Sequence, residues 1–216
     1  MNNHDSRTII KNIIQGVVIT EPQSVITTVR NHLCRSFSTN TKIEKNFEHH
    51  SRIKEEQKQF LIEFIEANNL WLAEKISEER YLTEGGEAKI YFGNDNKSVV
   101  KFNDAIYYNT WLDFFNSLLI HNTLFELTAY ELLGFKKAND DLYAVLKQPF
   151  IVSDSAVDLK DVKEILEFNG FKNTKRNDYY NAELGIILED MHDENVIVNS
   201  NMLFFIDTVF YIHIVD

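Results

Sequence analysis

Cysteine, positive charge and long apolar runs are all scarce in this sequence. The single cysteine, Cys34, cannot close a disulfide within the chain and gives no metal-site spacing, which favours a reducing cytoplasm. Lysine and arginine number 22 against 33 acidic residues, a net charge of −11. This balance argues against sequence-independent nucleic-acid binding, because such binding needs basic surface to displace counterions. No apolar run approaches the roughly 20 residues that cross a bilayer, and the first residues lack the basic flank and apolar core of a signal peptide.

What the sequence does contain is typical of a globular protein. Hydrophobic residues make up 44% and charged residues 25% of the 216 residues, which is ordinary for a chain that buries a core. The length fits one domain, or one domain with an appendage. We therefore expect a cytoplasmic protein that binds neither nucleic acid nor membranes, although a small local site remains compatible with a nucleotide.

The first 75 residues differ from the rest of the chain. Residues 8–28 mix β-branched and polar side chains without a clear period, and the hydroxyl-rich residues 36–42 are typical of a loop. Residues 51–69 have apolar side chains at three- and four-residue spacing, which predicts a helix. We predict that residues 1–75 form a partly helical N-terminal extension, loosely attached to the remainder of the protein.

Strand and helix signals alternate after that extension. Turn residues separate three strand-like segments at 81–83, 88–92 and 98–102, which predicts an antiparallel meander. The next predicted elements are a helix over residues 105–120, strands near 129–135 and 142–146, and a helix over 155–169 ended by Gly170. A last hairpin turns at residues 199–201. This order of elements indicates an α+β fold.

Polar residues lie at both open ends of the last hairpin. Asn195 and Asp207 are each six residues from Asn201, so an ideal register would make them cross-strand neighbours. An amide oxygen and a carboxylate together suit Mg²⁺. Asp190 precedes Asn195 by five residues and could accept a proton from a hydroxyl, and His192 could contact a phosphate or orient Asp190. The alternative interpretation is a surface hairpin whose ends are merely polar.

Two features of the predicted meander favour a phosphate site. Gly85-Gly86 lies between two predicted strands, where glycine lets the backbone approach phosphates closely. Lys101 lies in the middle of an apolar strand and needs an anionic partner, which a nucleotide could supply. An ordinary tight turn and an edge-strand lysine that extends to solvent are the alternatives.

Taken in order, this set resembles the protein kinase and aminoglycoside phosphotransferase superfamily. More narrowly, it is similar to small kinase-like domains of polyvalent proteins from phages and mobile elements. The motifs that carry the narrower resemblance are Gly85-Gly86-Glu87-Ala88, Tyr107-Tyr108-Asn109-Thr110-Trp111, His121-Asn122, Glu131-Leu132-Leu133-Gly134-Phe135, Gln148-Pro149-Phe150-Ile151 and Asp190-Met191-His192-Asp193-Glu194-Asn195-Val196.

The resemblance implies a minimal two-lobed kinase-like fold. An antiparallel β N-lobe would span about residues 76–150 and a reduced C-lobe about residues 151–216, after the helical N-terminal extension. ATP and Mg²⁺ are the implied cofactors, with a protein or small molecule of unknown identity as acceptor.

The resemblance also implies roles for individual residues. Asp190 and His192 would be catalytic, Asn195 and Asp207 would hold the metal, and Lys101 would bind the phosphates below the Gly85-Gly86 turn. Gln148 would belong to the hinge that receives adenine on its backbone groups. Asp113, or failing that Glu126, would be the helix carboxylate that pairs with Lys101.

Departures from the family pattern leave a second hypothesis open. Leu188-Glu189 replaces the usual His-Arg before the catalytic aspartate, and there is one glycine pair in place of a longer phosphate loop. The sequence ends nine residues after Asp207, with no activation segment. An active phosphotransferase and a pseudokinase that binds a nucleotide or a partner are both compatible with these residues, and transfer of the nucleotide itself is a third possibility.

Overall fold

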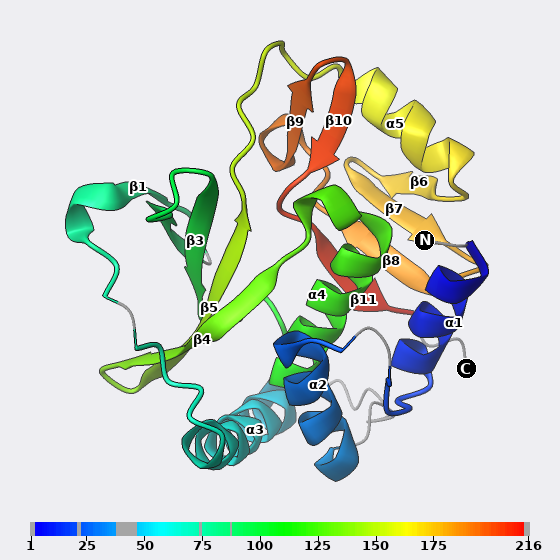
Figure 1. The fold of residues 1–216 in the computed structure, drawn as a ribbon. Helices are drawn as coiled ribbons and strands as arrows, with labels where there is room; N and C mark the ends of the chain where they lie inside the picture. Colours follow the sequence, from blue (N-terminus) through cyan, green and yellow to red (C-terminus); the bar gives the residue numbers. More distant parts are fainter. Residues whose placement is uncertain (1–2, 21–22, 38–46, 74, 87, 214–216) are drawn as a thin grey trace.

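The computed structural model describes residues 3–20, 23–37, 47–73, 75–86 and 88–213. Within these ranges the fold is α+β, with helices α1 to α5, a five-stranded antiparallel sheet, a four-stranded antiparallel sheet and a separate two-stranded hairpin. In Figure 1 the five-stranded sheet lies on one side, the smaller sheets lie on the other, and α4 runs between them. The α+β prediction is confirmed.

The predicted meander forms one half of the five-stranded sheet. Its strands are β1 (Tyr81–Glu84), β2 (Ala88–Phe92) and β3 (Ser98–Asn103). The second predicted pair forms β4 (Glu131–Ala138) and β5 (Asp141–Pro149), and the strand order is β1-β2-β3-β5-β4. Asn96 and Asn139 take left-handed φ values of 55° in the two tight connections, a conformation that asparagine tolerates better than most residues.

Helix α4 (Trp111–Leu124) begins later than predicted. Residues 105–110 form a turn region instead of its first turn, because the Thr110 hydroxyl accepts the Asp113 N–H and caps the helix there. The Gln57 side chain accepts a second free N–H, that of Leu112, at 3.0 Å. Ten of the fourteen residues of α4 are buried, which is why its apolar residues surround the whole helix and do not form one stripe.

The remaining elements form the second half of the molecule. Helix α5 (Leu159–Phe168) confirms the predicted helix over a shorter range, since Asp158 caps its first turn. The four-stranded sheet has the order β11-β8-β7-β6. Its strands are β6 (Lys172–Lys175), β7 (Asp178–Asn181), β8 (Ile186–Glu189) and β11 (Val209–Ile212). The hairpin of β6 and β7 had no sequence prediction.

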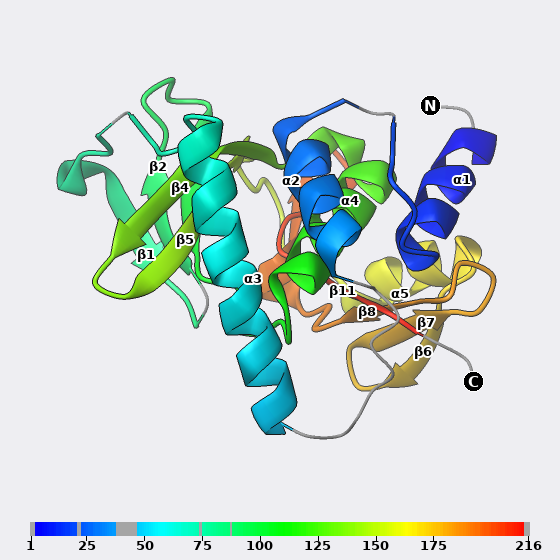
Figure 2. The same cartoon turned by 90° about the horizontal axis from the view of Figure 1, so that it is seen from below.

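Three helices precede the sheets: α1 (Asn3–Ile14), α2 (Val25–Ser36) and α3 (Phe47–Ala67). The first two were not predicted, because β-branched residues disfavour helices locally and only tertiary packing compensates for that. Figure 2 shows α3 running across the molecule between the five-stranded sheet and α2. Ser36 ends α2, and residues 38–42 of the predicted loop lie outside the described ranges.

The expected loose attachment of these helices is wrong. Ile10, Val29 and Leu61 are each at most 1% exposed and belong to the same core as Phe115 of α4. The buried Arg30 guanidinium joins the helices further, since it donates to Ile13 O, Val17 O and Asn116 Oδ1. A buried cation with only neutral acceptors is costly to bury, so its dense hydrogen bonding fixes α1, α2 and α4 together.

The segment after α3 is also bonded to the sheet. Phe135 N donates to Leu70 O at 2.9 Å, and Leu72 N donates to Phe135 O at 2.8 Å. The neighbouring Gly134 has φ +146° at a break in the register of β4, and a β-carbon there would lie 2.6 Å from Leu70 O. Glycine is therefore needed for this close approach, which connects the N-terminal region to the β4–β5 hairpin.

Candidate functional site

A cavity of about 490 Å³ lies between the β1–β2 turn and the loops after β8 and β10. Six of the nine predicted site residues line it: Gly85, Gly86, Asp190, His192, Asn195 and Asp207. Its other lining residues are Ala88, Ile90, Tyr107, Asp178, Glu189, Glu194, Val209 and Tyr211. The predicted residues are thus brought together from two sheets and a hairpin far apart in the sequence.

The β9 (Val196–Asn199) and β10 (Met202–Phe205) hairpin has a register different from the one predicted by one residue. Met202 pairs with Asn199, and the two turn residues, Ser200 and Asn201, have φ values of 51° and 60°. Two left-handed residues are the signature of a tight two-residue hairpin turn. As a consequence Asn195 faces Ile206, whose N–H donates to Asn195 O at 3.0 Å, and Asp207 lies one position further on.

Asn195 is oriented by its own loop. Its Nδ2 donates to the main-chain oxygen of Asp190 at 2.8 Å, across the short helix η3 (Asp193–Asn195). This bond uses the donor end of the amide and leaves Oδ1 as the end available to a ligand. The five-residue spacing between Asp190 and Asn195 therefore produces a closed loop with a fixed amide oxygen.

His192 connects the two ends of this loop. Its Nδ1 accepts the Glu194 N–H at 3.2 Å. Nε2 lies 3.2 Å from Asn195 Nδ2 and 3.4 Å from Asp190 Oδ2. The ring thus lies between Asp190 and Asn195, and the two roles considered for His192 both stay predictions.

Lys101 is not among the residues that line the cavity, but it forms an ion pair with Asp207, which is. The two charged atoms, Nζ and Oδ1, are 3.3 Å apart, and the side chains are 6% and 37% exposed. Nζ also lies 3.3 Å from Ile206 O and 5.5 Å from the centre of the Tyr130 ring. The lysine is therefore not an edge-strand residue that extends into solvent.

The helix carboxylate that the family pattern suggested is not the partner of Lys101. Asp113 lies in the first turn of α4, where its Oδ2 accepts the Thr110 hydroxyl at 2.7 Å, and it does not line the cavity. Glu126, the second candidate, lies in η2 (Glu126–Thr128) and lines a different cavity. Asp207 is the carboxylate that pairs with Lys101.

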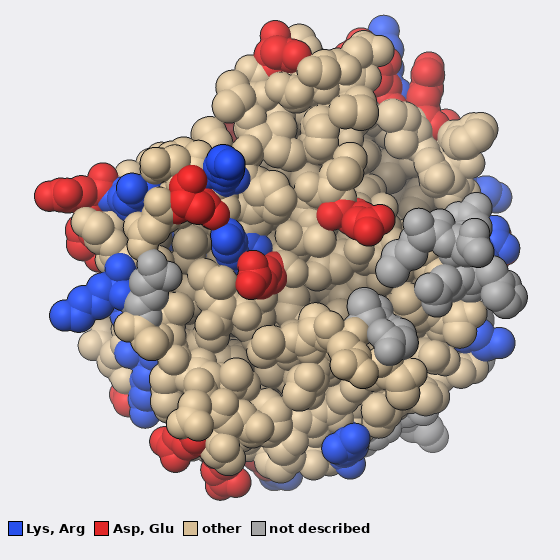
Figure 3. Space-filling view, in the orientation of Figure 1, with Lys and Arg blue, Asp and Glu red and all other residues tan. Residues whose placement is uncertain are grey.

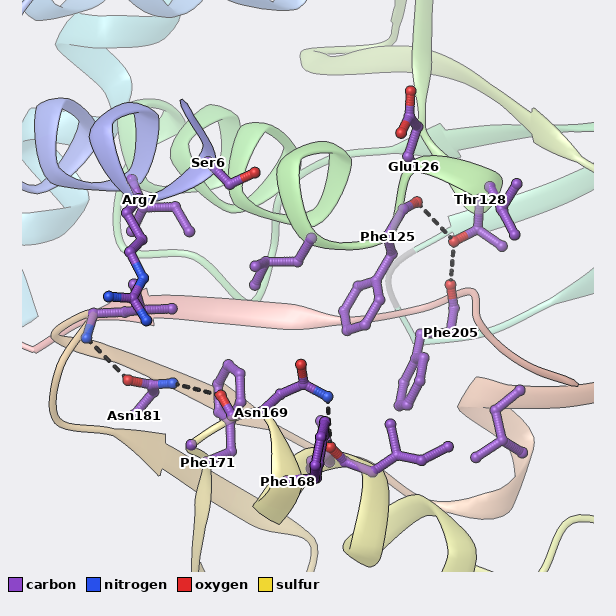
Figure 4. A pocket seen from close by; sticks show the side chains of 18 of the residues that line it. Ser6, Arg7, Phe125, Glu126, Thr128, Phe168, Asn169, Phe171, Asn181 and Phe205 are labelled. Atoms are coloured by element: carbon purple, nitrogen blue, oxygen red, sulfur yellow. Dashed lines mark hydrogen bonds between the residues drawn. The ribbon is translucent and has the colours of Figure 1, made fainter. Parts of the chain in front are cut away.

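Residues 205–208, which carry Asp207, are held from behind by buried polar groups. The Thr128 hydroxyl donates to Phe205 O at 2.6 Å, as Figure 4 shows, and Tyr130 Oη donates to Ile206 O at 2.7 Å. The Thr208 hydroxyl lies 2.7 Å from His121 Nδ1. The residues on both sides of Asp207 are thus bonded to α4, to η2 and to Tyr130, which lies between η2 and β4, and these bonds fix the segment that carries its carboxylate.

His121 is the centre of that buried network. Its Nε2 lies 2.9 Å from Thr128 O, so Nε2–H is the donor and Nδ1 accepts from Thr208. Burial lowers the pKa of His121 to about 4, against the opposing effect of the hydrogen bond to Thr128. The ring is therefore neutral at pH 7.

The Gln148 side chain belongs to the same network. Its Nε2 donates to Thr128 O at 2.7 Å, and the residue is 1% exposed in β5. The amide therefore ties β5 to η2, and the residue does not line the 490 Å³ cavity. Its place in a hinge that receives adenine on backbone groups stays a prediction of the family resemblance.

The glycine pair covers the cavity from the β1–β2 side. A β-carbon at Gly86 would lie 2.1 Å from the Tyr107 hydroxyl, so any larger residue would displace that ring. Gly85 has open space around it, and its N–H donates to Ala88 O at 2.9 Å. A side chain at Gly86 would therefore require the exposed Tyr107 ring to move, whereas a side chain at Gly85 would meet open space.

Sequence reasoning missed the acidic residues that line the opposite wall. Asp178 comes from the unpredicted hairpin of β6 and β7, and Glu189 is the last residue of β8. Burial, followed by the charges of Asp178 and Asp190, raises the pKa of Glu189. Glu189 was expected in solvent, and only the pairing of β7 with β8 brings Asp178 beside it.

A larger cavity, of about 740 Å³, lies between α1, η2, α5 and β10. It is shown in Figure 4 and contains none of the nine predicted site residues. Its lining combines aromatic side chains, among them Phe125, Phe168 and Phe205, with the exposed Arg7–Glu183 ion pair. Six of the nine predicted site residues therefore line the smaller of the two cavities, and none lines the larger one.

Surface charge, helix length and clusters of metal-binding side chains indicate which kinds of partner the protein could bind. In Figure 3, acidic and basic side chains lie along the outline of the face and also close together near its middle. Within the described ranges no helix has the length and apolarity to cross a membrane. The same ranges contain no group of three or more histidine, cysteine, aspartate or glutamate side chains arranged to hold a metal.

Comparison with known proteins gives one match. No curated protein and no solved structure matches the chain. Residues 54–214 match the family described as serine/threonine/tyrosine kinase found in polyvalent proteins, and this range includes α4, both sheets and every residue that lines the 490 Å³ cavity. The match covers most of the chain and agrees with the narrower resemblance seen in the motifs. The chain therefore belongs to the family of kinases found in polyvalent proteins.

Proposed function

We propose that this protein is an ATP- and Mg²⁺-dependent phosphotransferase whose reaction takes place in the 490 Å³ cavity. The observation that carries the proposal is the Lys101–Asp207 ion pair, because its carboxylate, that of Asp207, lines the same cavity as Asn195 and Asp190. A buried cation, a carboxylate, an amide oxygen and an exposed carboxylate are the groups that phosphoryl transfer requires. The nucleotide would lie between an N-lobe of about residues 76–150 and a C-lobe of about residues 151–216.

The residues present fit a hard divalent cation. Asp207 supplies carboxylate oxygens, and Asn195 supplies an amide oxygen because its nitrogen is already bonded to Asp190 O. Oxygen donors on a site that keeps room for phosphate oxygens and water are typical of Mg²⁺. When bound there, Mg²⁺ would neutralise part of the charge on the transferring phosphate.

Lys101 and the glycine turn would bind the phosphates of ATP. The Lys101 ammonium is almost fully buried, so its charge is poorly screened and its interaction with an anion is stronger than at the surface. The Gly85-Gly86 turn lies on the other side of the cavity and leaves Gly85 uncovered. The phosphates of ATP would then lie between the Lys101 ammonium and the backbone of the glycine turn.

Asp190 would orient the acceptor hydroxyl and accept its proton. Its side chain is 67% exposed, and the His192 ring, whose Nε2 lies 3.4 Å from Oδ2, would hold the carboxylate toward the cavity. A hydroxyl of a protein or of a small molecule can approach an exposed carboxylate equally well, so the acceptor class stays open.

A second candidate function is a pseudokinase that binds a nucleotide or partner without turnover. The observation that favours it is the pairing of Lys101 with Asp207, which leaves the lysine without a helix carboxylate to hold it when Asp207 binds metal. The sequence Leu188-Glu189 in place of His-Arg points the same way.

Calorimetric titration with ATP, with and without Mg²⁺, tests the proposal. We expect metal-dependent binding by the wild type, at least about tenfold weaker binding by Asp207→Ala and Lys101→Met, and no change in Glu164→Ala, which alters an exposed carboxylate on α5. Transfer of radiolabelled phosphate that Asp190→Ala abolishes would exclude the pseudokinase. Binding that Asp207→Ala leaves intact would contradict the proposed site.

A further inference from the structure

The turn between β6 and β7 lies directly against the loop that carries Asp190. Met191 N donates to Asn177 O at 3.0 Å, and Asp190 N donates to the side chain of Asp178, at Oδ1, at 3.2 Å. These two bonds come from a hairpin that precedes β8 in the chain and adds two strands to the four-stranded sheet.

Asp190 needs such support because of its backbone conformation. Its φ of +62° is left-handed, which costs a non-glycine residue energy that the surroundings must offset. The regular pairing of β7 with β8 ends near Tyr179 and Leu188, so the Asp190 N–H has no main-chain acceptor in that ladder. The Asp178 carboxylate supplies the missing acceptor.

The contact is specific to the side chain of Asp178. The main-chain oxygen of Asp178 is used elsewhere, by Asn173 Nδ2 at 3.1 Å and Thr174 Oγ1 at 3.1 Å inside the hairpin turn. Two hydrogen bonds therefore fix the backbone of Asp178 while Oδ1 remains directed at the Asp190 peptide. Asp178 also lines the cavity, so a direct contact with a ligand is the competing interpretation.

We propose that Asp178 is a positioning residue, whose carboxylate holds the Asp190 peptide in its left-handed conformation and so directs the Asp190 side chain into the cavity. This inference rests on the proposed function, since it assigns Asp190 the catalytic role. It also fits the replacement of the usual His-Arg by Leu188-Glu189, because Asp178 supports the Asp190 loop from outside that motif. The side chain at position 178 must accept the hydrogen bond of the Asp190 N–H, and the negative charge of that side chain matters less.

Three variants separate positioning from contact with a ligand: Asp178→Ala removes the acceptor, Asp178→Asn keeps an acceptor oxygen without the charge, and Glu164→Ala is the control on α5. Turnover is followed as release of radiolabelled phosphate from Mg·ATP to water, and Mg·ATP affinity is measured by calorimetry. Independently of activity, NMR-detected hydrogen exchange reports the Asp190 amide in the protein without nucleotide.

Positioning predicts a distinct set of results. Asp178→Ala should lower kcat about tenfold and speed exchange of the Asp190 amide about tenfold, because one hydrogen bond is lost. Asp178→Asn should restore both to within about threefold of the wild type, and Mg·ATP affinity should stay unchanged in all three variants.

Other results overturn the inference. Equal loss of kcat in Asp178→Ala and Asp178→Asn, or weaker Mg·ATP binding in both, would mean that the charge of Asp178 acts on the ligand. Unchanged exchange at Asp190 in Asp178→Ala would mean that the bond does not hold the peptide. If Asp178→Ala does not fold, exchange in Asp178→Asn and the wild type decides, since faster exchange in Asp178→Asn contradicts a role for the acceptor alone. If the wild type releases no phosphate, the proposed function fails, while the exchange measurement still decides the contact.

Discussion

The two loops that meet in the cavity are held in opposite ways. Residues 205–208, which carry Asp207, are bonded to buried side chains of α4 and η2 and to Tyr130. Residues 190–195, which carry Asp190, are bonded mainly within their own loop and to the half-buried residues Asn177 and Asp178 at the start of β7. The side chain of Asp207 is 37% exposed and that of Asp190 is 67% exposed.

This difference matches the roles proposed for Asp207, which would bind the metal, and Asp190, which would accept a proton. A metal ligand such as Asp207 must keep its place because cation binding depends on fixed distances between oxygens. The second proposed ligand, Asn195, lies in the loop of Asp190 and is fixed there by its own bond to Asp190 O. A carboxylate that receives a proton from a variable acceptor needs an orientation but can tolerate local adjustment. The comparison predicts that changes behind Asp207 act through stability of the whole protein, whereas changes around Asp190 act on turnover with little effect on stability.

The largest expected effect is that of His121→Ala. Removing a fully buried ring and its bonds to Thr128 and Thr208 should lower the free energy of unfolding by about 4 kcal/mol. Urea denaturation measures this change. A loss no larger than that of His192→Ala would show that the two loops do not differ in the way described.

Acid should weaken the same network in the wild type. The pKa of His121 is about 4 in the folded protein and near 6.5 when the ring is exposed, so the unfolded state takes up the proton first as pH falls. The contribution of neutral His121 is therefore complete above about pH 6.5 and is lost by about pH 4, a change of about 3 kcal/mol.

Denaturation curves between pH 7 and pH 4 test this expectation. The matched control is His121→Asn, which cannot titrate, so the difference in pH dependence between wild type and variant isolates the ring. Parallel pH dependence in the two proteins would contradict a buried neutral histidine.

Thr128→Val should have an intermediate effect. It removes the hydroxyl that donates to Phe205 O while keeping the side-chain shape, and should cost about 1 to 2 kcal/mol of stability. Mg·ATP affinity should fall with it, because the Asp207 segment loses an anchor. Thr123→Val is the control: its hydroxyl donates to Leu119 O within α4, away from Asp207, so calorimetry should show normal Mg·ATP binding.

The smallest effect on stability is expected for His192→Ala. The ring lies in a partly exposed loop, so the free energy of unfolding should change by less than about 0.5 kcal/mol. Phosphate release should nevertheless fall, because Asp190 loses the ring that faces its Oδ2. Thermal unfolding and phosphate release, measured on one preparation of His192→Ala, test the two expectations. A large loss of stability with unchanged phosphate release would contradict the difference proposed between the two loops.

Several elements were predictable because their signals are local. The turn residues of the meander, the helical spacing of Phe60, Leu61, Phe64 and Ile65 and the cap-bounded α5 each depend on neighbours in the sequence. The helices α1 and α2 were not predictable in the same way, because isoleucine, valine and threonine favour strands until a tertiary core buries them. The hairpin of β6 and β7 was missed for a related reason, since its pairing with β8 is a tertiary property.

The sequence by itself determined which chemical groups this protein brings to its site. The order and spacing of Gly85-Gly86, Lys101, Asp190, Asn195 and Asp207 resemble the kinase pattern, and the family match over residues 54–214 confirms that resemblance. Only the tertiary structure decided their partners. Lys101 pairs with Asp207 and not with Asp113, Gln148 is buried against η2, and Asp178 supports Asp190, because these contacts join residues that no local pattern relates.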